Sequence, residues 1–446
     1  MIILNILGIC LFCFASVSNV YCNENSTVKE DLTVSEKKTF SVITLKNGMK
    51  VILKKTDFDS GQVFIRITAI GGFASIALEK LVSGVISTQA ALESGFEGIT
   101  ADKFYADEIE LSIELLPYHR RIDGFSTASD FNKLLNYINQ YFKKQTFTET
   151  AFNAVKKTFA NQSMISKYDQ EQAYQQAFLD INTQNFAWMQ PLEVKDIQKA
   201  DSKLSQDIFR GFFCDPAEFI AVVVGDFDDK TIIQEIEKYL GSIPKKESTF
   251  NFSKPPIPAF PQKNITKEII HTGQKNSLAR LTFPLFCINS DLYPAITLIM
   301  DLLDRRLSEK LKQLFNEDQR IESFYENPTF PHLDLPLLVI QFRSETYLVH
   351  KIQSAILCEV KKLCEEGITQ SALDHLKKEF LRKDAFWLYD NIFWLTLLSD
   401  YQTMQWQMDD TTGTLEQISQ VTLDQVNKIL KELLSKTNHT FLYSHP

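Results

Sequence analysis

The spacing of the histidines decides which metal chemistry this sequence can perform. A zinc hydrolase built on one helix needs two histidines four residues apart, with a glutamate directly before the second, because the pair binds the metal and the carboxylate activates its water. No two of the seven histidines lie three or four residues apart. They are His119, His271, His332, His350, His375, His439 and His445. Only a zinc site assembled from distant histidines stays open.

Other familiar reaction centres are also missing from the sequence. It has no Gly-x-Ser-x-Gly, no phosphate-binding loop and no cysteine with a plausibly paired histidine. Beyond residue 22, the scattered cysteines Cys214, Cys287, Cys358 and Cys364 form neither a disulfide framework nor a zinc cluster, and we expect them to be buried. The net charge of −9, without a cluster of Lys and Arg, argues against nucleic acid as a partner.

The first residues predict export. An uncharged apolar run over residues 2–17 ends in small residues, which is typical of a signal peptide, here residues 1–22. An uncleaved membrane anchor is the alternative, but a spanning helix needs about 20 apolar residues. No later segment resembles a membrane span, so we expect no membrane contact beyond the signal peptide.

Two pairs of segments indicate an internal duplication. Residues 147–160 (FTETAFNAVKKTFA) and 368–381 (ITQSALDHLKKEFL) share a Thr, an Ala, a Lys-Lys pair and a Phe at the same spacing, at an offset of 368 − 147 = 221. Residues 197–213 match residues 418–434 as helical patterns at the same offset, 418 − 197 = 221. Two matches at one offset predict two homologous halves.

The composition places a boundary between these halves. Residues 242–264 are rich in Pro, Ser and Lys and lack periodicity, so we predict a linker between a first domain, 36–241, and a second, 265–446. In the first domain, Asn47-Gly48 between apolar stretches predicts a hairpin. Strands followed by helices and a final strand predict an α+β class, each half an antiparallel sheet with helices packed on one face.

Several stretches carry a resemblance to a known family. They include residues 225–244 (GDFDDKTIIQEIEKYLGSIP), 302–313 (LLDRRLSEKLKQ) and 364–380 (CEEGITQSALDHLKKEF). With them the chain resembles the insulinase or pitrilysin-like zinc peptidases, in the branch of bacterial zinc proteases and mitochondrial processing peptidase. The resemblance implies a pseudo-symmetric clam shell of two α+β halves. It also implies that pairs of such chains enclose a chamber for extended peptides.

The motif that makes family members catalytic is degenerate here. Their zinc helix carries His-x-x-Glu-His after a Gly-Leu-Ala sequence, and Gly84-Val-Ile is the matching stretch. The histidine positions then fall on Ser87 and Ala91, and the glutamate position falls on Ala90. A methyl group offers no lone pair, and one hydroxyl does not hold zinc. The resemblance therefore implies no catalytic residue and no metal ligand in this chain, with zinc expected only in a partner.

Substrate contacts are the remaining candidates. The family's second half contributes an Arg and, seven residues later, a Tyr, and these positions are occupied by Lys312 and Gln319, with Tyr325 as a substitute if the loop is longer. Lys keeps the charge but loses the bidentate fork. Alternating strands over residues 107–128 resemble the family's chamber edge, where we expect Ser112 and Glu114 to offer backbone groups to peptide. Otherwise the edge is covered by the chain itself or by a partner.

Three functions are compatible with these residues. The first is a non-catalytic subunit of an exported peptidase in a bacterial periplasm, paired as a heterodimer with a catalytic chain, closing the chamber and binding extended peptide. The second is a stand-alone peptide-binding or assembly protein without a proteolytic role. The third is an active metallopeptidase with an unusual site.

Overall fold

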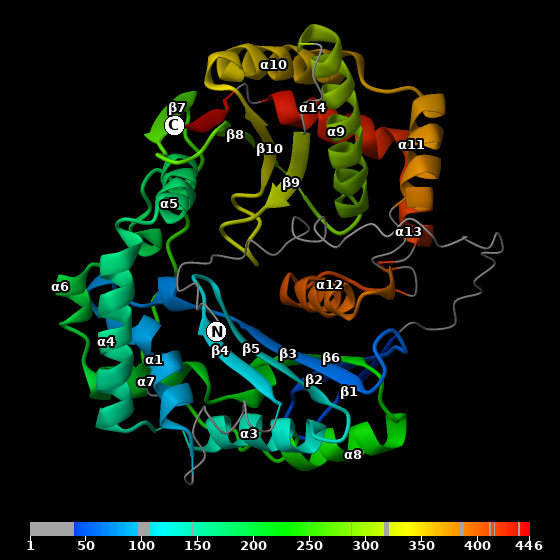
Figure 1. The fold of residues 1–446 in the computed structure, drawn as a ribbon. Coiled ribbons are helices and arrows are strands. Elements are labelled where there is room, and N and C mark those ends of the chain that lie inside the picture. The colour runs from blue at the N-terminus through cyan, green and yellow to red at the C-terminus, as the bar shows by residue number, and fades with distance from the viewer. Residues whose placement is uncertain are drawn as a thin grey trace.

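The computed structural model describes residues 40–96, 108–144, 146–248, 250–286, 288–315, 321–383, 388–409, 412–413, 415–435 and 438–446. They form two β-sheets, each surrounded by helices, so the α+β class with two halves is confirmed (Figure 1). The expected signal peptide, residues 1–22, lies outside the described residues. Within the described ranges, no helix combines the length and the apolar character needed to cross a bilayer.

The first sheet has the strand order β1-β2-β6-β3-β5-β4. Its strands are β1 (Ser41–Thr44), β2 (Lys50–Lys55), β3 (Gln62–Ile70), β4 (Glu110–Leu115), β5 (His119–Thr127) and β6 (Ile220–Gly225). β1 and β2 form the hairpin predicted around Asn47-Gly48, where Gly48 has a φ of 92°. β6 pairs parallel to β2. The sheet is therefore mixed, and not antiparallel as expected, because the chain returns to it only after a long helical crossover.

The second sheet repeats this topology. Its strands are β7 (Ile265–Ile270), β8 (Ser277–Pro284), β9 (Ile321–Glu326), β10 (Leu337–Ser344) and β11 (Thr440–His445). Their order, β7-β11-β8-β10-β9, is the order of β2-β6-β3-β5-β4 in the first sheet. β11 is parallel to β7, as β6 is to β2. The duplication predicted from the sequence is thus a repeat of this five-stranded arrangement, to which the first sheet adds β1.

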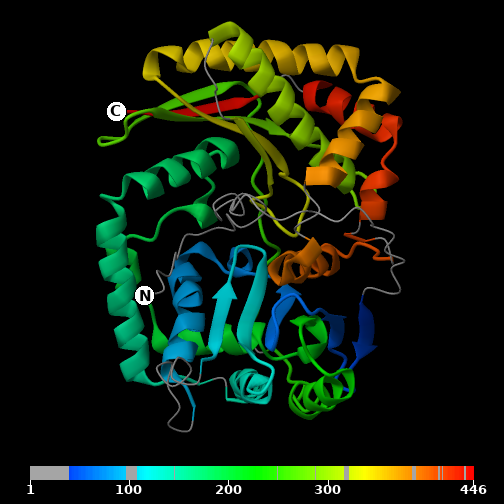
Figure 2. The same ribbon diagram turned by 45° about the vertical axis from the view of Figure 1, so that its right-hand side comes forward.

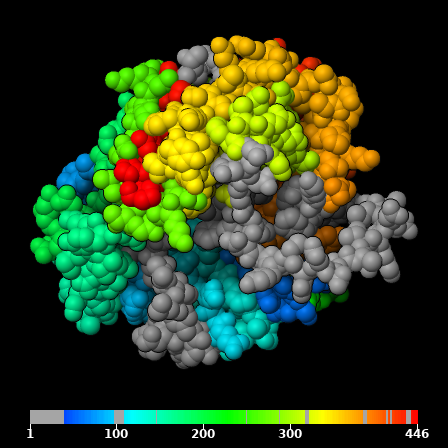
Figure 3. All heavy atoms as spheres, turned by 45° about the horizontal axis from the view of Figure 1, so that its top comes forward, coloured from blue at the N-terminus to red at the C-terminus, as the bar shows by residue number. Residues whose placement is uncertain are grey.

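Helices cover the outer faces of both sheets, and those of the second half, α9 and α10, form the upper surface in Figure 3. In the first half they are α1 (Leu81–Ser94), α3 (Phe131–Lys143), α4 (Glu149–Ser166), α6 (Val194–Ile197), α7 (Ser202–Phe212) and α8 (Asp229–Tyr239). In the second half they are α9 (Tyr293–Phe315), α10 (Val349–Glu366), α11 (Gln370–Lys383), α13 (Leu415–Ser419) and α14 (Leu423–Ser435). The starts of α4 and α11 are related by the offset of the repeat, 370 − 149 = 221.

Two further helices are exchanged between the halves. They are α5 (Gln170–Thr183) and α12 (Asn391–Thr403), whose starts are related by the same offset, 391 − 170 = 221. Each is capped by an aspartate, Asp169 or Asp390, whose carboxylate accepts two backbone N–H groups of the first turn. α12 contacts β3 and β6 of the first sheet, whereas α5 contacts β7 and β11 of the second (Figure 2). Helices therefore lie on both faces of each sheet, and the expectation of one covered face is wrong.

Each exchanged helix completes the hydrophobic core of the other half. Trp394 and Leu398 of α12 are buried with Val222 of β6. Tyr174 and Phe178 of α5 are buried with residues of β8, β10 and β11. The described residues of 242–264 form neither helix nor strand. The two halves are therefore joined by shared packing as well as by the connecting segment.

Candidate functional site

The three degenerate motif positions lie on the packed side of α1. Ser87 and Ala90 are 0 % exposed and Ala91 is 3 % exposed. The Ser87 hydroxyl donates a hydrogen bond to the carbonyl of Gly84 at 2.6 Å, and both alanines belong to the first hydrophobic core. These positions offer no lone pair to a cation at an accessible surface, so they do not fit a zinc ion.

Other metal ligands do not gather elsewhere in the described part of the chain. No three His, Cys, Asp or Glu side chains there are placed to hold a metal ion. Cys214, Cys358 and Cys364 carry free thiols. Cys214 and Cys364 are buried as expected, but Cys358 is exposed because it lies on the outer side of α10.

The candidates in the second half lie on separate elements. Lys312 is exposed in the last turn of α9, and Gln319 lies outside the described residues. Tyr325 of β9 is half-buried against the second core, and its ring meets that of Tyr293 edge-to-face at 5.7 Å. Tyr325 is therefore placed as a packing residue at the margin of the core.

Strand β4 forms one edge of the first sheet. It pairs with β5, and no other described strand pairs with it. The N–H of Leu116 donates to the carbonyl of His119 at 2.9 Å. This hydrogen-bonded pair determines which residues of β4 point their backbone groups toward β5. Because antiparallel partners alternate, residues 112 and 114 turn their backbone groups toward β5, whereas residues 111, 113 and 115 turn theirs outward. The expectation that Ser112 and Glu114 offer edge donors is thus wrong, and Leu111, Ile113 and Leu115 do so.

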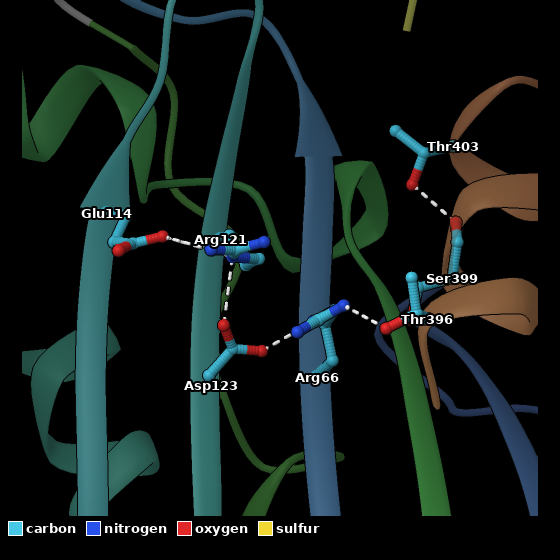
Figure 4. A network of polar contacts seen from close by, with 7 residues as sticks. All are labelled: Arg66, Glu114, Arg121, Asp123, Thr396, Ser399 and Thr403. Atoms are coloured by element: carbon cyan, nitrogen blue, oxygen red, sulfur yellow. Dashed lines mark hydrogen bonds and ion pairs between the residues drawn. The ribbon is translucent and has the colours of Figure 1, made fainter. Parts of the chain in front are cut away.

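The side chains of Ser112 and Glu114 nevertheless belong to the site. Successive side chains of a strand point to opposite faces, so both share a face with their partners on β5, Asp123 and Arg121. This inner face is the one turned toward α12 (Figure 4). Glu114 is 42 % exposed, so the inner face is open at the edge strand.

A row of alternating charges crosses the inner face from β3 to β4 (Figure 4). Arg66 Nε lies 2.6 Å from Asp123 Oδ1, and Arg121 Nε lies 2.9 Å from Asp123 Oδ2. Arg121 in turn donates to Glu114 Oε2 from Nε at 3.1 Å and from Nη2 at 2.5 Å. Burial favours protonation of Asp123, but Arg121 and Arg66 outweigh it and hold its pKa below the usual value. Asp123 is therefore ionised at neutral pH.

Helix α12 anchors the inner end of this row. Arg66 Nη1 donates to Thr396 Oγ1 at 3.2 Å. Asp400 follows one turn later, where burial raises its pKa to about 6 against the opposing influence of Arg66 and Arg121. Contacts from β5 and α12 thus hold Arg66, and contacts from β4 and β5 hold Arg121.

The turn of the β4–β5 hairpin is covered by the second half. The ring of His119 meets Phe330 edge-to-face at 4.9 Å, and Tyr118 meets His332 in the same way at 5.4 Å. Burial lowers the pKa of His119 to about 3, so its imidazole is neutral and does not serve as a proton carrier near neutral pH. The accessible part of the site is therefore the edge strand and not the turn.

Sequence reasoning did not select Arg66, Arg121 or Asp123. The available signal was a charge within a strand: one Arg in the apolar stretch FIRITA, and Arg121 and Asp123 at alternate positions of HRRIDGF. Such charges need partners when the strand is covered, because an unpaired buried charge is strongly disfavoured. That signal indicates a polar network but does not identify the partners.

Comparisons with known proteins agree with this architecture. Residues 213–380 match the family described as "Peptidase M16 inactive domain". A "Zinc protease PQQL-like" of Arabidopsis thaliana is 22 % identical over 377 residues, which are 81 % of this chain and 37 % of that protein. Among solved structures, the periplasmic protease PqqL from Escherichia coli superposes with a TM-score of 0.72 at 16 % identity, over 96 % of this chain and 48 % of that one.

A protease from Helicobacter pylori gives the same TM-score of 0.72 at 16 % identity, over 91 % of this chain and 99 % of its own. The chain thus spans 37 % of the Arabidopsis protein and 48 % of PqqL, but nearly all of the Helicobacter chain. The family match over residues 213–380 and the repeated fold show that the chain is similar to the M16, or insulinase-like, peptidases, and its sequence contains no His-x-x-Glu-His.

Proposed function

We propose that this chain is a non-catalytic subunit of an exported M16 peptidase, and that it binds extended peptide along β4 for an active partner chain. One observation carries the proposal. On α1, which packs against β4, Ser87, Ala90 and Ala91 are buried where the family has its zinc ligands and its glutamate. β4 nevertheless remains an edge that no described strand completes. Catalysis needs the ligands, whereas binding by strand addition needs only the edge.

The direction in which the backbone groups of β4 point determines how a peptide would bind. The outward N–H and C=O groups of Leu111, Ile113 and Leu115 are spaced to pair with alternate residues of an extended peptide. The side chains of Ser112 and Glu114 then lie beside alternate peptide side chains on the inner face. Affinity would come from the backbone and selectivity from those side chains.

The partner and the location rest on the comparisons. Because the family resemblance implies that pairs of such chains enclose a chamber, we propose that a catalytic partner chain supplies the other half; the present chain covers 48 % of PqqL. That partner would hold the zinc ion, because the described residues of the present chain include no ligand set that fits one. The periplasmic location stated for PqqL and the signal-like residues 1–22 support export to a periplasm.

The test measures zinc, hydrolysis and peptide binding on the purified chain. We expect no stoichiometric zinc by elemental analysis and no cleavage of an unstructured fluorescent peptide. We expect the same peptide to bind, as followed by fluorescence anisotropy. In a series of peptides that each carry one N-methylated residue, binding should be weaker at every second position of the methyl group, because only alternate peptide N–H groups face β4.

Two proline variants on opposite edges of the sheet provide the matched comparison. Leu111→Pro removes an outward donor of β4. Val42→Pro removes an outward backbone N–H from β1. The N–H of Leu45 donates to the carbonyl of Met49 and so points toward β2, and because the direction alternates along the strand, the N–H of Val42 points outward. We expect loss of peptide binding in Leu111→Pro alone, with folding checked by circular dichroism. Equal binding by both variants, or an N-methyl scan without a two-residue period, would rule out binding along β4.

A further inference from the structure

The row of charges on the inner face ends at the edge of the sheet. From β3 outward its members are Arg66, Asp123, Arg121 and Glu114, so the sign alternates at every step (Figure 4). Asp123 and Arg121 each have an oppositely charged neighbour on both sides, and Arg66 has one such neighbour and a hydrogen bond to α12. Glu114 is the last member, and beyond it no described strand follows.

Glu114 has an unused acceptor on the open side. Both hydrogen bonds from Arg121 go to Oε2, and Oε1 accepts none from any described residue. The side chain is 42 % exposed, so Oε1 is accessible to a ligand. A carboxylate with one occupied and one open oxygen can bind a second cation beside the first.

A strand added to β4 would bring one side chain directly opposite Glu114. Cross-strand neighbours have Cβ atoms about 4.5 to 5.5 Å apart, and opposite charges at such positions attract. The only other ionisable side chain of β4, Glu110, lies on the same inner face four residues earlier and is also acidic. A peptide on this edge therefore meets carboxylates on its inner side and no positive charge from β4.

We propose that the β4 edge selects extended peptides with a Lys or Arg opposite Glu114, so that the basic side chain continues the alternating row. This inference rests on the proposed binding of peptide along β4. It assigns Glu114 as the residue that determines specificity, whereas the outward backbone groups provide binding that does not depend on the peptide sequence. An acidic residue at the same peptide position would be repelled by Glu114.

The test uses three unstructured peptides of one length that differ at a single central position, which is Arg, Gln or Glu. Their dissociation constants are measured on the full chain by fluorescence anisotropy. We expect the Arg peptide to bind about two- to fivefold more tightly than the Gln peptide, and the Glu peptide to bind more weakly than both. In Glu114→Gln the difference between Arg and Gln peptides should vanish.

Glu79→Gln is the matched control, because Glu79 is also exposed but lies outside the sheet. It should keep the preference for Arg. If this control loses the preference too, or if Glu114→Gln keeps it, the preference comes from the overall charge of −9 and the assignment of Glu114 is wrong. Equal binding of all three peptides would refute the selectivity and leave peptide binding intact. Absence of binding by all three would instead refute the proposed function.

Discussion

Arg66 and Arg280 hold equivalent positions in the two sheets, and each bonds a helix that comes from the other half. Arg66 bonds Thr396 of α12 at 3.2 Å, and Arg280 Nη1 bonds Gln175 Oε1 of α5 at 2.7 Å. Thr396 and Gln175 are themselves related by the offset of the repeat, 396 − 175 = 221. Arg280 Nε also bonds Gln341 on the neighbouring strand at 2.9 Å. The two halves are thus interlocked by a repeated arginine contact.

This interlock predicts that the halves unfold together. Arg66→Gln and Arg280→Gln should each lower the midpoint of a single transition in differential scanning calorimetry. A loss of about 1 to 3 kcal/mol is expected, because each change leaves buried polar partners without their donor. Two separated transitions, or an effect of each variant on only one of them, would contradict the interlock.

The neutral imidazole of His119 predicts loss of stability in acid. Burial lowers its pKa to about 3 from an ordinary 6.5, so the unfolded chain binds a proton between these values and the folded chain does not. The contribution of His119 is therefore complete above about pH 6.5 and is lost as the pH falls toward 3. In His119→Phe, which retains a ring against Phe330, urea unfolding should show a smaller loss of stability between pH 7 and pH 4. The difference between the two chains should be about 3 kcal/mol at most.

The exposed His375 supplies the control for this pH dependence. His375→Phe should lose as much stability in acid as the original chain does. If His119→Phe shows the full acid sensitivity as well, His119 is not buried in its neutral form.

Asp400 should act in the opposite direction. Burial raises its pKa to about 6 from an ordinary 3.8, so the folded chain keeps a proton that the unfolded chain has released. Its contribution is present below about pH 4 and declines as the pH rises through about 6. Asp400→Asn should reduce the loss of stability between pH 4 and pH 7 in urea titrations. An unchanged pH profile in this variant would show that Asp400 is ionised in both states.

Restoring the motif should not restore a peptidase. The triple variant Ser87→His, Ala90→Glu, Ala91→His supplies the missing ligand types, but at positions that are at most 3 % exposed. We expect no stoichiometric zinc and a loss of at least about 2 kcal/mol of stability, because larger polar groups are forced into a packed core. Elemental analysis and thermal unfolding measure both quantities. A folded variant with one tightly bound zinc would show that α1 still presents these positions to an open site.

Local patterns in the sequence predicted much of this protein. The internal repeat predicted two similar halves, and the Asn-Gly turn and the alternating strands predicted the hairpin and the edge. Ser87, Ala90 and Ala91 stand where the resemblance places the zinc ligands and the glutamate, and from these residue types the sequence predicts that the chain binds no zinc. These features depend on residue types and on spacing along the chain, which the sequence contains directly.

The exchange of α5 and α12 was decided only by the tertiary structure. An apolar helix face can be buried against any apolar sheet face, and both halves contain such faces. The sequence therefore does not determine which sheet each helix covers. The ion-pair and hydrogen-bond partners in the charge row could not be predicted from the sequence either. Arg66 and Asp123 are 57 residues apart, and Arg66 and Thr396 are 330 apart. Strand register and helix exchange bring them together, because hydrogen bonds and ion pairs depend on distance in space and not along the chain.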